Sequence, residues 1–170
     1  MIKRLRHIHR AWVIFVIVFF FTLFYPLYYY AARHPKRYGL LNKLRRWNGI
    51  CSSLFSGIFF RLNFEEPLQH GQTYIYCANH SSNLDIVVFC LLAKGRFHFM
   101  GKEELLNNPV LKLFFNTIDI PVNRERNISA FRAFKKAGEN LESGMSLIIF
   151  PEGGIHSEGY PPELQPFKNG

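Results

Sequence analysis

Acidic residues are missing from the first third of this 170-residue chain. Residues 1–64 hold 11 Lys and Arg but no Asp or Glu, whereas residues 65–170 hold 10 Lys and Arg and 12 Asp and Glu. The net charge of +9 therefore belongs to the N-terminal third. A basic domain can indicate a nucleic-acid-binding protein. Here, however, the basic residues flank long apolar runs, so we expect anionic lipid headgroups as partners and no nucleic acid.

Cysteine is scarce, and its few positions form no pattern. The three residues, Cys51, Cys77 and Cys90, have neither close pairing nor the spacing of metal ligands. Cys77 and Cys90 lie in apolar stretches, where we expect them to be small buried side chains, as in a protein of a reducing compartment. The histidines are scattered, so no metal site is predicted. Internal repeats and low-complexity tracts are also absent, and the length suits one domain.

Charge of either sign is absent from residues 11–32, a run of 22 residues. At about 1.5 Å per residue, a helix of this length can cross a bilayer. The run is too long and too aromatic for the apolar part of a signal peptide, and no small-x-small cleavage site precedes Arg33. Tyrosines gather near its end, as in an interfacial belt, at Tyr25, Tyr28, Tyr29 and Tyr30.

A second apolar segment covers residues 47–60 and is too short for an ordinary span, so it is typical of an interfacial or re-entrant helix. Basic residues lie on both sides of the first run, and the cluster between the two segments is Arg33, Lys36, Arg37, Lys43, Arg45 and Arg46. A helical hairpin dipping into one leaflet keeps every cluster on the cytoplasmic face, whereas a single crossing, the alternative, does not. We expect a membrane location at that face, in a bacterial inner membrane.

Residues 79–85 lie between a predicted buried strand, 73–78, and a predicted apolar helix that begins near Asp85. A carboxylate that follows His80 by five residues can reach back to its ring. It would then fix the tautomer and leave the other ring nitrogen free as a general base. Ser81 or Ser82 is expected to be the N-cap of the helix. In the alternative interpretation, Asp85 only binds backbone N–H groups in a capping-box-like pattern.

The rest of the chain alternates strands and helices. Residues 65–72 read as a linker, and the elements expected after the first helix are a strand at 96–100, a short helix at 109–115, a strand at 117–122, a helix from 127 to about 143, and a strand at 146–150. The helix from 127 carries apolar residues at Ile128, Phe131, Phe134 and Leu141, which we expect to form its apolar face. This order predicts an α/β fold with a largely parallel or mixed sheet flanked by helices, preceded by an N-terminal two-helix membrane anchor. The predicted boundaries are 1–64 for the anchor and 65–170 for the α/β domain.

Charged residues follow several of the predicted strands. His80, Lys102, Arg124 and Glu152 should converge on one rim, where open α/β sheets bind ligands. Lys102 and Arg124 are suited to bind a phosphate, although solvated surface cations are the alternative. For Glu152 the alternative is a turn carboxylate that accepts backbone N–H groups. His98 and His70 are expected to be structural.

The segment Asn79-His80-x-Ser82-x-x-Asp85 resembles the signature of the glycerolipid acyltransferases, which include 1-acylglycerol-3-phosphate acyltransferase. Four later segments resemble further blocks of that family in the same order, at residues 102–105, 118–124, 150–153 and 166–170. The resemblance covers residues 65–170. One departure is Ile155, where the family has arginine, with His156 as a partial replacement. Since the fourth block only begins at residue 166, we expect the C-terminal part of the domain to be missing.

The resemblance implies a membrane-bound O-acyltransferase of phospholipid biosynthesis. His80, oriented by Asp85, would deprotonate the sn-2 hydroxyl of 1-acyl-sn-glycerol 3-phosphate, and the alkoxide would attack an acyl-CoA or acyl carrier protein thioester to give phosphatidic acid. No cofactor and no covalent acyl-enzyme are implied. The alternatives are a different lyso-lipid acceptor, or a non-catalytic membrane protein that binds anionic lipid. The implied substrate-binding residues are Lys102, Arg124, Glu152 and Gly153, with Asn79, Ser82 and His156 as further candidates.

Overall fold

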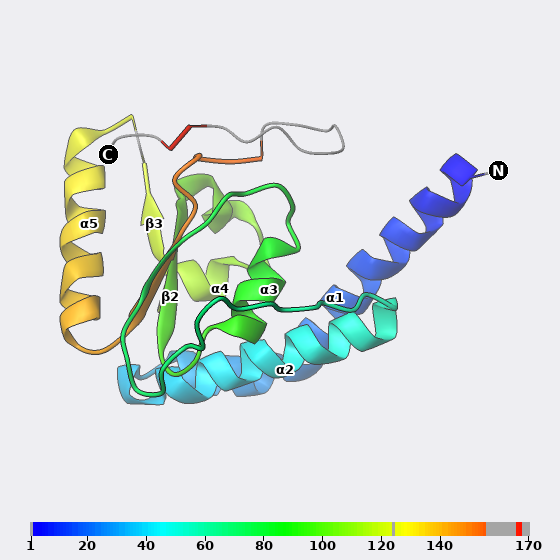
Figure 1. The fold of residues 1–170 in the computed structure, drawn as a ribbon, viewed down its shortest axis with the longest axis horizontal. Helices are drawn as coiled ribbons and strands as arrows, with labels where there is room; N and C mark the ends of the chain where they lie inside the picture. The colour runs from blue at the N-terminus through cyan, green and yellow to red at the C-terminus, as the bar shows by residue number, and fades with distance from the viewer. Residues whose placement is uncertain (1, 124, 156–165, 168–170) are drawn as a thin grey trace.

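The computed structural model describes residues 2–123, 125–155 and 166–167 (Figure 1). Two long helices come first, and short strands and helices then alternate. The elements are α1 (Ile2–Ala32), η1 (Pro35–Arg37), α2 (Tyr38–Ser56), β1 (Ile75–Cys77), α3 (Asp85–Leu92), β2 (Phe97–Lys102), η2 (Glu103–Asn107), α4 (Lys112–Phe115), β3 (Ile120–Val122), α5 (Asn127–Glu142) and β4 (Ser146–Ile149).

The described strands form one parallel sheet in the order β1-β4-β2-β3. β2 and β4 are central, and Phe99 of β2 lies opposite Ile148 of β4. The prediction of an α/β fold is therefore confirmed, with a wholly parallel sheet among the described strands. Because β1 is an edge strand, its alternate side chains face solvent: Cys77 is exposed, so the prediction that it is buried was wrong, whereas Cys90 is buried as expected.

The sheet separates two apolar layers. On one side, Phe97 and Phe99 pack with Cys90 and Ala93 from the end of α3. On the other side α5 covers the sheet, as Figure 1 shows at the left. Alternation along β2 sends successive side chains to opposite layers. Because the strands are parallel, their carboxyl ends all lie at the same edge of the sheet, together with the loops that follow β1, β2 and β4.

The buried face of α5 differs from the predicted one. Ala133 and Ala137 pack on the sheet with Leu141 beside them, whereas Ile128 and Phe131 are 69% and 71% exposed and Phe134 is 47% exposed. The prediction of the apolar face was thus wrong for three of its four residues. Alanines allow the helix to approach the sheet closely. The face that α5 buries is therefore set by this close packing and not by which side chains are largest.

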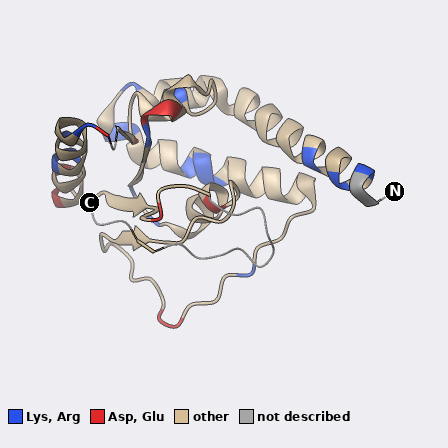
Figure 2. Ribbon diagram, turned by 90° about the horizontal axis from the view of Figure 1, so that it is seen from above, with Lys and Arg blue, Asp and Glu red and all other residues tan. Residues whose placement is uncertain are grey.

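The N-terminal third forms two packed, antiparallel helices. The indole N–H of Trp12 donates to the Phe55 carbonyl (3.0 Å), and the Tyr28 hydroxyl donates to the Leu44 carbonyl (3.2 Å). By length and composition, the stretch of α1 from Arg4 to Ala32 is long and apolar enough to cross a membrane. Its N-terminal half projects away from the α/β part (Figure 1), and most of the Lys and Arg on it lie near that end (Figure 2).

α2 begins at Tyr38, well before the predicted apolar segment, so it includes the basic residues Lys43, Arg45 and Arg46. Arg45 of that cluster is buried, and its guanidinium is paired with the buried Asp119, with Nη1 donating to Oδ1 at 3.1 Å. The guanidinium also lies over the Phe114 ring, 4.0 Å from its centroid. The prediction that this whole cluster lies among lipid headgroups is therefore wrong for Arg45. The guanidinium tolerates burial there because it makes two hydrogen bonds to the Asp119 carboxylate and stacks on an aromatic ring.

Candidate active site

His80 lies in the turn between β1 and α3, and its ring is held on two sides. Nδ1 is 3.0 Å from the Asp85 carboxylate oxygen Oδ2, and Asp85 is the first residue of α3. The ring also stacks on Phe150, with the centroids 4.2 Å apart. Since the carboxylate engages Nδ1, the nitrogen left for proton transfer is Nε2. The predicted reach of Asp85 back to the His80 ring is present in the structure.

Asp85 also binds backbone N–H groups, as the alternative, capping-box-like interpretation predicted. The same oxygen, Oδ2, accepts the backbone N–H groups of Ser81 and Ser82, each at 3.0 Å. One carboxylate therefore holds both the turn and the ring. The Ser82 hydroxyl accepts the N–H of Leu84 at 3.2 Å, inside the turn, while α3 has Leu84 at its N-cap with no side-chain bond. A serine N-cap for α3 was thus a wrong prediction.

Glu152 supports the same turn from the end of β4. Its side chain is buried, and it accepts hydrogen bonds from the Asn79 side-chain amide and, at 3.4 Å, from the backbone N–H of His80. Gly153 follows with φ +89°, a left-handed conformation that favours glycine. The Glu152 carboxylate therefore positions the loop that carries the histidine, which is the contact expected of a turn carboxylate.

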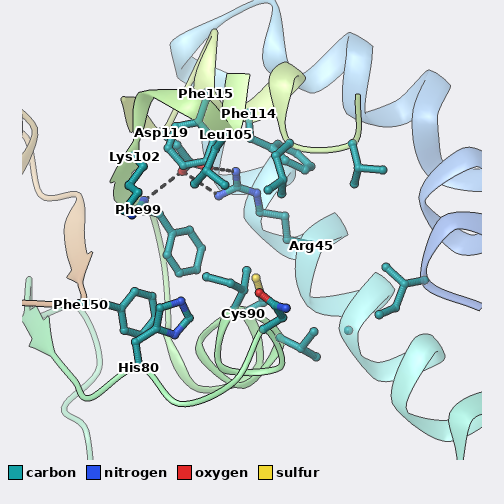
Figure 3. A pocket seen from close by; sticks show the side chains of 18 of the residues that line it. Arg45, His80, Cys90, Phe99, Lys102, Leu105, Phe114, Phe115, Asp119 and Phe150 are labelled. Carbon is teal, nitrogen blue, oxygen red and sulfur yellow. Dashed lines mark hydrogen bonds and ion pairs between the residues drawn. The ribbon is translucent and has the colours of Figure 1, made fainter. Parts of the chain in front are cut away.

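A cavity of about 380 Å³ lies between the α1/α2 pair, α3 and the sheet (Figure 3). It brings together three of the predicted site residues, because His80, Lys102 and Gly153 all line it. Most of its wall is apolar, and the labelled rings of Phe99, Phe114, Phe115 and Phe150 surround it. Its size is within the range of small-molecule sites, and its apolar wall with a few polar groups is typical of them.

Cys90 and Arg45, deeper in the cavity, each keep one charge state. Burial raises the pKa of the Cys90 thiol to about 12, so it stays protonated and is a poor nucleophile. Burial alone would lower the pKa of Arg45, but the Asp119 carboxylate more than offsets this and the pKa is raised. Among the described residues, no group of three or more His, Cys, Asp or Glu side chains is arranged to hold a metal ion.

Two predicted site residues, Arg124 and His156, lie outside the described residues. Other wall residues were missed by sequence reasoning: Phe150, which stacks on His80, and Asn83, which lines the cavity beside it. Phe150 directly precedes Pro151-Glu152-Gly153, so its place before a motif was a usable signal.

A row of polar residues on α2 also lines the cavity: Arg45, Asn48 and Ser52. Their spacing of three and four residues was the signal for one helix face.

Comparisons with known proteins identify the family of the chain. Residues 60–170 match the family model described as Acyltransferase. The chain is 29% identical over 134 residues (74% of the chain, 36% of the relative) to a chloroplastic 1-acyl-sn-glycerol-3-phosphate acyltransferase of Arabidopsis thaliana. It is 33% identical over 98 residues (56% and 34%) to a 1-acyl-sn-glycerol-3-phosphate acyltransferase of Limnanthes alba. An uncharacterized acyltransferase of Schizosaccharomyces pombe is 27% identical over 128 residues (74% and 45%). The chain thus spans less than half the length of these relatives, and no solved structure gives a significant match.

Proposed function

Because the chain belongs to the acyltransferase family, we propose that it transfers an acyl chain from a thioester to the hydroxyl of a lysophospholipid. The observation that carries this proposal is the His80–Asp85 pair, joined at 3.0 Å, on the wall of a largely apolar cavity. A histidine whose ring is held by a carboxylate is a common general base in enzymes. An apolar wall beside it suits a substrate with a hydrocarbon chain.

The proposed reaction has one proton transfer in each direction. Nε2 of His80 takes the proton of the acceptor hydroxyl while the oxygen attacks the thioester carbonyl, and Asp85 stabilises the imidazolium that forms. The C–S bond then breaks, and the thiolate leaves with the proton from Nε2. Stacking on Phe150 and the bonds from Ser81 and Ser82 to Asp85 keep the ring in place throughout. No cysteine or serine nucleophile is required.

For the acceptor we propose 1-acyl-sn-glycerol 3-phosphate, which would give phosphatidic acid. The names of the two plant relatives support this choice, as does Lys102, a cation at the end of β2 on the same cavity wall as His80. A cation there is suited to bind the acceptor's phosphate. Arg124 would join it, and the donor would be acyl-CoA or acyl carrier protein.

We place the enzyme at the cytoplasmic face of a membrane, anchored by α1 and α2 as a hairpin. The support is the apolar surface of α1, where large side chains such as Phe15, Phe19 and Leu23 are exposed. Such a surface is unfavourable in water and favourable in lipid. Arg4, Arg6 and Arg10 at one end provide the charge that anionic headgroups attract.

One assay tests the function: purified protein, a labelled acyl-CoA or acyl carrier protein, and a panel of lyso-lipids. Wild type should acylate lysophosphatidate, and His80→Ala should not. Lys102→Ala should raise the apparent KM of the phosphate-bearing acceptor by about tenfold or more, and that of the donor less, because a charge-assisted contact contributes about 1.5–3 kcal/mol. Lys94→Ala, an exposed cation outside the cavity wall, is the matched control. Vesicle binding without turnover on any acceptor would instead support a non-catalytic lipid-binding protein.

A further inference from the structure

The C-terminal half of α2 has a polarity opposite to that of an ordinary helix in a water-soluble domain, whereas the N-terminal half buries Leu41 and Leu44 as usual. Its inward side carries buried polar residues, among them Arg45, Ser52 and Ser56. Its outward side carries large apolar residues, and Trp47, Leu54 and Phe55 are 59%, 57% and 64% exposed. A helix normally turns its apolar stripe toward the protein. The outward face therefore suits contact with lipid chains, and the inward face suits contact with polar groups.

The inward face does not simply fill a protein interior. Arg45, Asn48 and Ser52, the polar row of α2, line the same cavity as His80 and Lys102. The Ser52 hydroxyl donates to the Asn48 side-chain oxygen at 2.9 Å, so these two groups form one continuous polar strip. Ile17 of α1 lines the cavity too. This residue lies within the charge-free run 11–32, so the cavity reaches the part of α1 that suits the bilayer.

We propose that the polar row of α2 guides the polar headgroup of a bilayer-embedded lysophospholipid sideways from the membrane to His80. This inference rests on the proposed function and adds the route of the acceptor. Moving a headgroup with its phosphate through an apolar wall would leave its polar atoms without partners, which is strongly unfavourable. Asn48 and Ser52 offer hydrogen-bonding groups along the way, while the acyl tail of the lysolipid stays in lipid against the outward face of α1 and α2.

A purely structural explanation of the same residues has to be separated from this one. Small residues such as Gly49 and Ser52 allow helices to pack closely, and a Cβ at Gly49 would meet Val87 and Leu91 of α3 at 3.4 Å. Packing needs the small size of Ser52 but not its hydroxyl. Ser52→Ala keeps the size and removes the hydroxyl, so it distinguishes a polar path from a packing role.

The test compares one reaction with two acceptors. Wild type, Ser52→Ala and the double variant Asn48→Leu/Ser52→Ala are reconstituted in vesicles of phosphatidylethanolamine and phosphatidylglycerol. The acceptor is either a long-chain lysophosphatidate embedded in the vesicles or a short-chain, water-soluble one. For the embedded acceptor we expect the apparent KM to rise about threefold in Ser52→Ala and about tenfold in the double variant, with kcat retained. For the soluble acceptor, both constants should stay within about twofold.

Ser53→Ala is the matched control, since its hydroxyl donates to the Gly49 carbonyl of its own helix at 2.7 Å and it is not part of the cavity wall. It should behave as wild type. An active wild type with an unchanged KM in Ser52→Ala and the double variant would overturn the path and leave a packing role. Equal rises for both acceptors would place the row in the final binding site and also overturn the path. An inactive wild type would refute the proposed function itself, and the path with it.

Discussion

Replacing Asp85 by asparagine tests the centre of the site. Asparagine keeps the shape, and its side-chain oxygen can still accept the N–H groups of Ser81 and Ser82, so the turn should survive. It can also still accept from Nδ1 of His80. The change therefore removes mainly the negative charge, and the expected loss of stability is about 1 kcal/mol or less.

The rate effect follows from the distance. An imidazolium and a carboxylate 3.0 Å apart attract each other by about 5.5 kcal/mol at an effective dielectric constant of about 20. Both side chains are partly exposed, at 16% and 22%, so screening reduces the attraction to about 3–5 kcal/mol. This attraction exists only when the ring is protonated during the reaction. Its loss should therefore lower kcat by about 10²- to 10⁴-fold.

The assay is steady-state acylation at saturating substrates, with thermal melting of each variant. His80→Ala should be as inactive as Asp85→Asn, and the double variant should be little worse, because the two residues act as one unit. Ser82→Ala, which loses a hydroxyl of the same turn without touching the ring, should retain most activity. If Asp85→Asn melts normally and keeps at least half of the wild-type turnover, the general-base pair is refuted.

Three further predictions concern the rest of the molecule. Burial lowers the pKa of His98 to about 4, below its unfolded value of about 6.5, so the unfolded state takes up the proton first. The contribution of His98 to stability should therefore be constant above pH 6.5 and fall by about 3 kcal/mol down to pH 4. Melting temperatures of His98→Leu should fall less over this pH range than those of wild type. Arg45→Met leaves Asp119 buried without its cation and should cost about 3–5 kcal/mol, seen as a lower melting temperature, and Asp119→Asn in the same chain should restore much of it. A Cβ at Gly101 would lie 2.8 Å from Phe115 and 2.9 Å from Leu105, and all three residues line the cavity. Gly101→Ala should therefore slow the transfer of long acyl chains more than that of short ones, whereas Gly138→Ala, with open space around it, should change neither rate. Equal slowing with all chain lengths would contradict the placement of the acyl chain in this cavity.

Local patterns were sufficient for the order of elements but not for the faces they bury. The strands around β1 and β4 and the helix after His80 were predicted because apolar runs end at clear turn signals. In α5, however, the choice of face depends on how closely the helix approaches the sheet, so Ala133 and Ala137 are buried while Phe131 is exposed. Hydrophobicity along one helix contains no information about that distance.

The site was predictable where it is local in sequence. His80 and Asp85 are five residues apart, and their contact was inferred from one turn. The hydrogen bond that the His80 backbone N–H donates to Glu152 joins residues 72 apart, so sequence reasoning gave the residue without this partner. Arg45 was misread because, in the sequence, it is one of several basic residues. Only the pairing with Asp119, 74 residues later, distinguishes it from its neighbours.

The separation between Arg45 and Asp119 also orders events during synthesis. At about 5–20 residues per second, the ribosome adds Asp119 about 4–15 s after Arg45. During that interval α2 has an uncompensated guanidinium, which disfavours the bilayer centre by about 2.5–3.5 kcal/mol. The charge of Arg45 is therefore compensated only after Asp119 has been made, whereas Lys43 and Arg46 keep α2 charged on its exposed side in the finished fold.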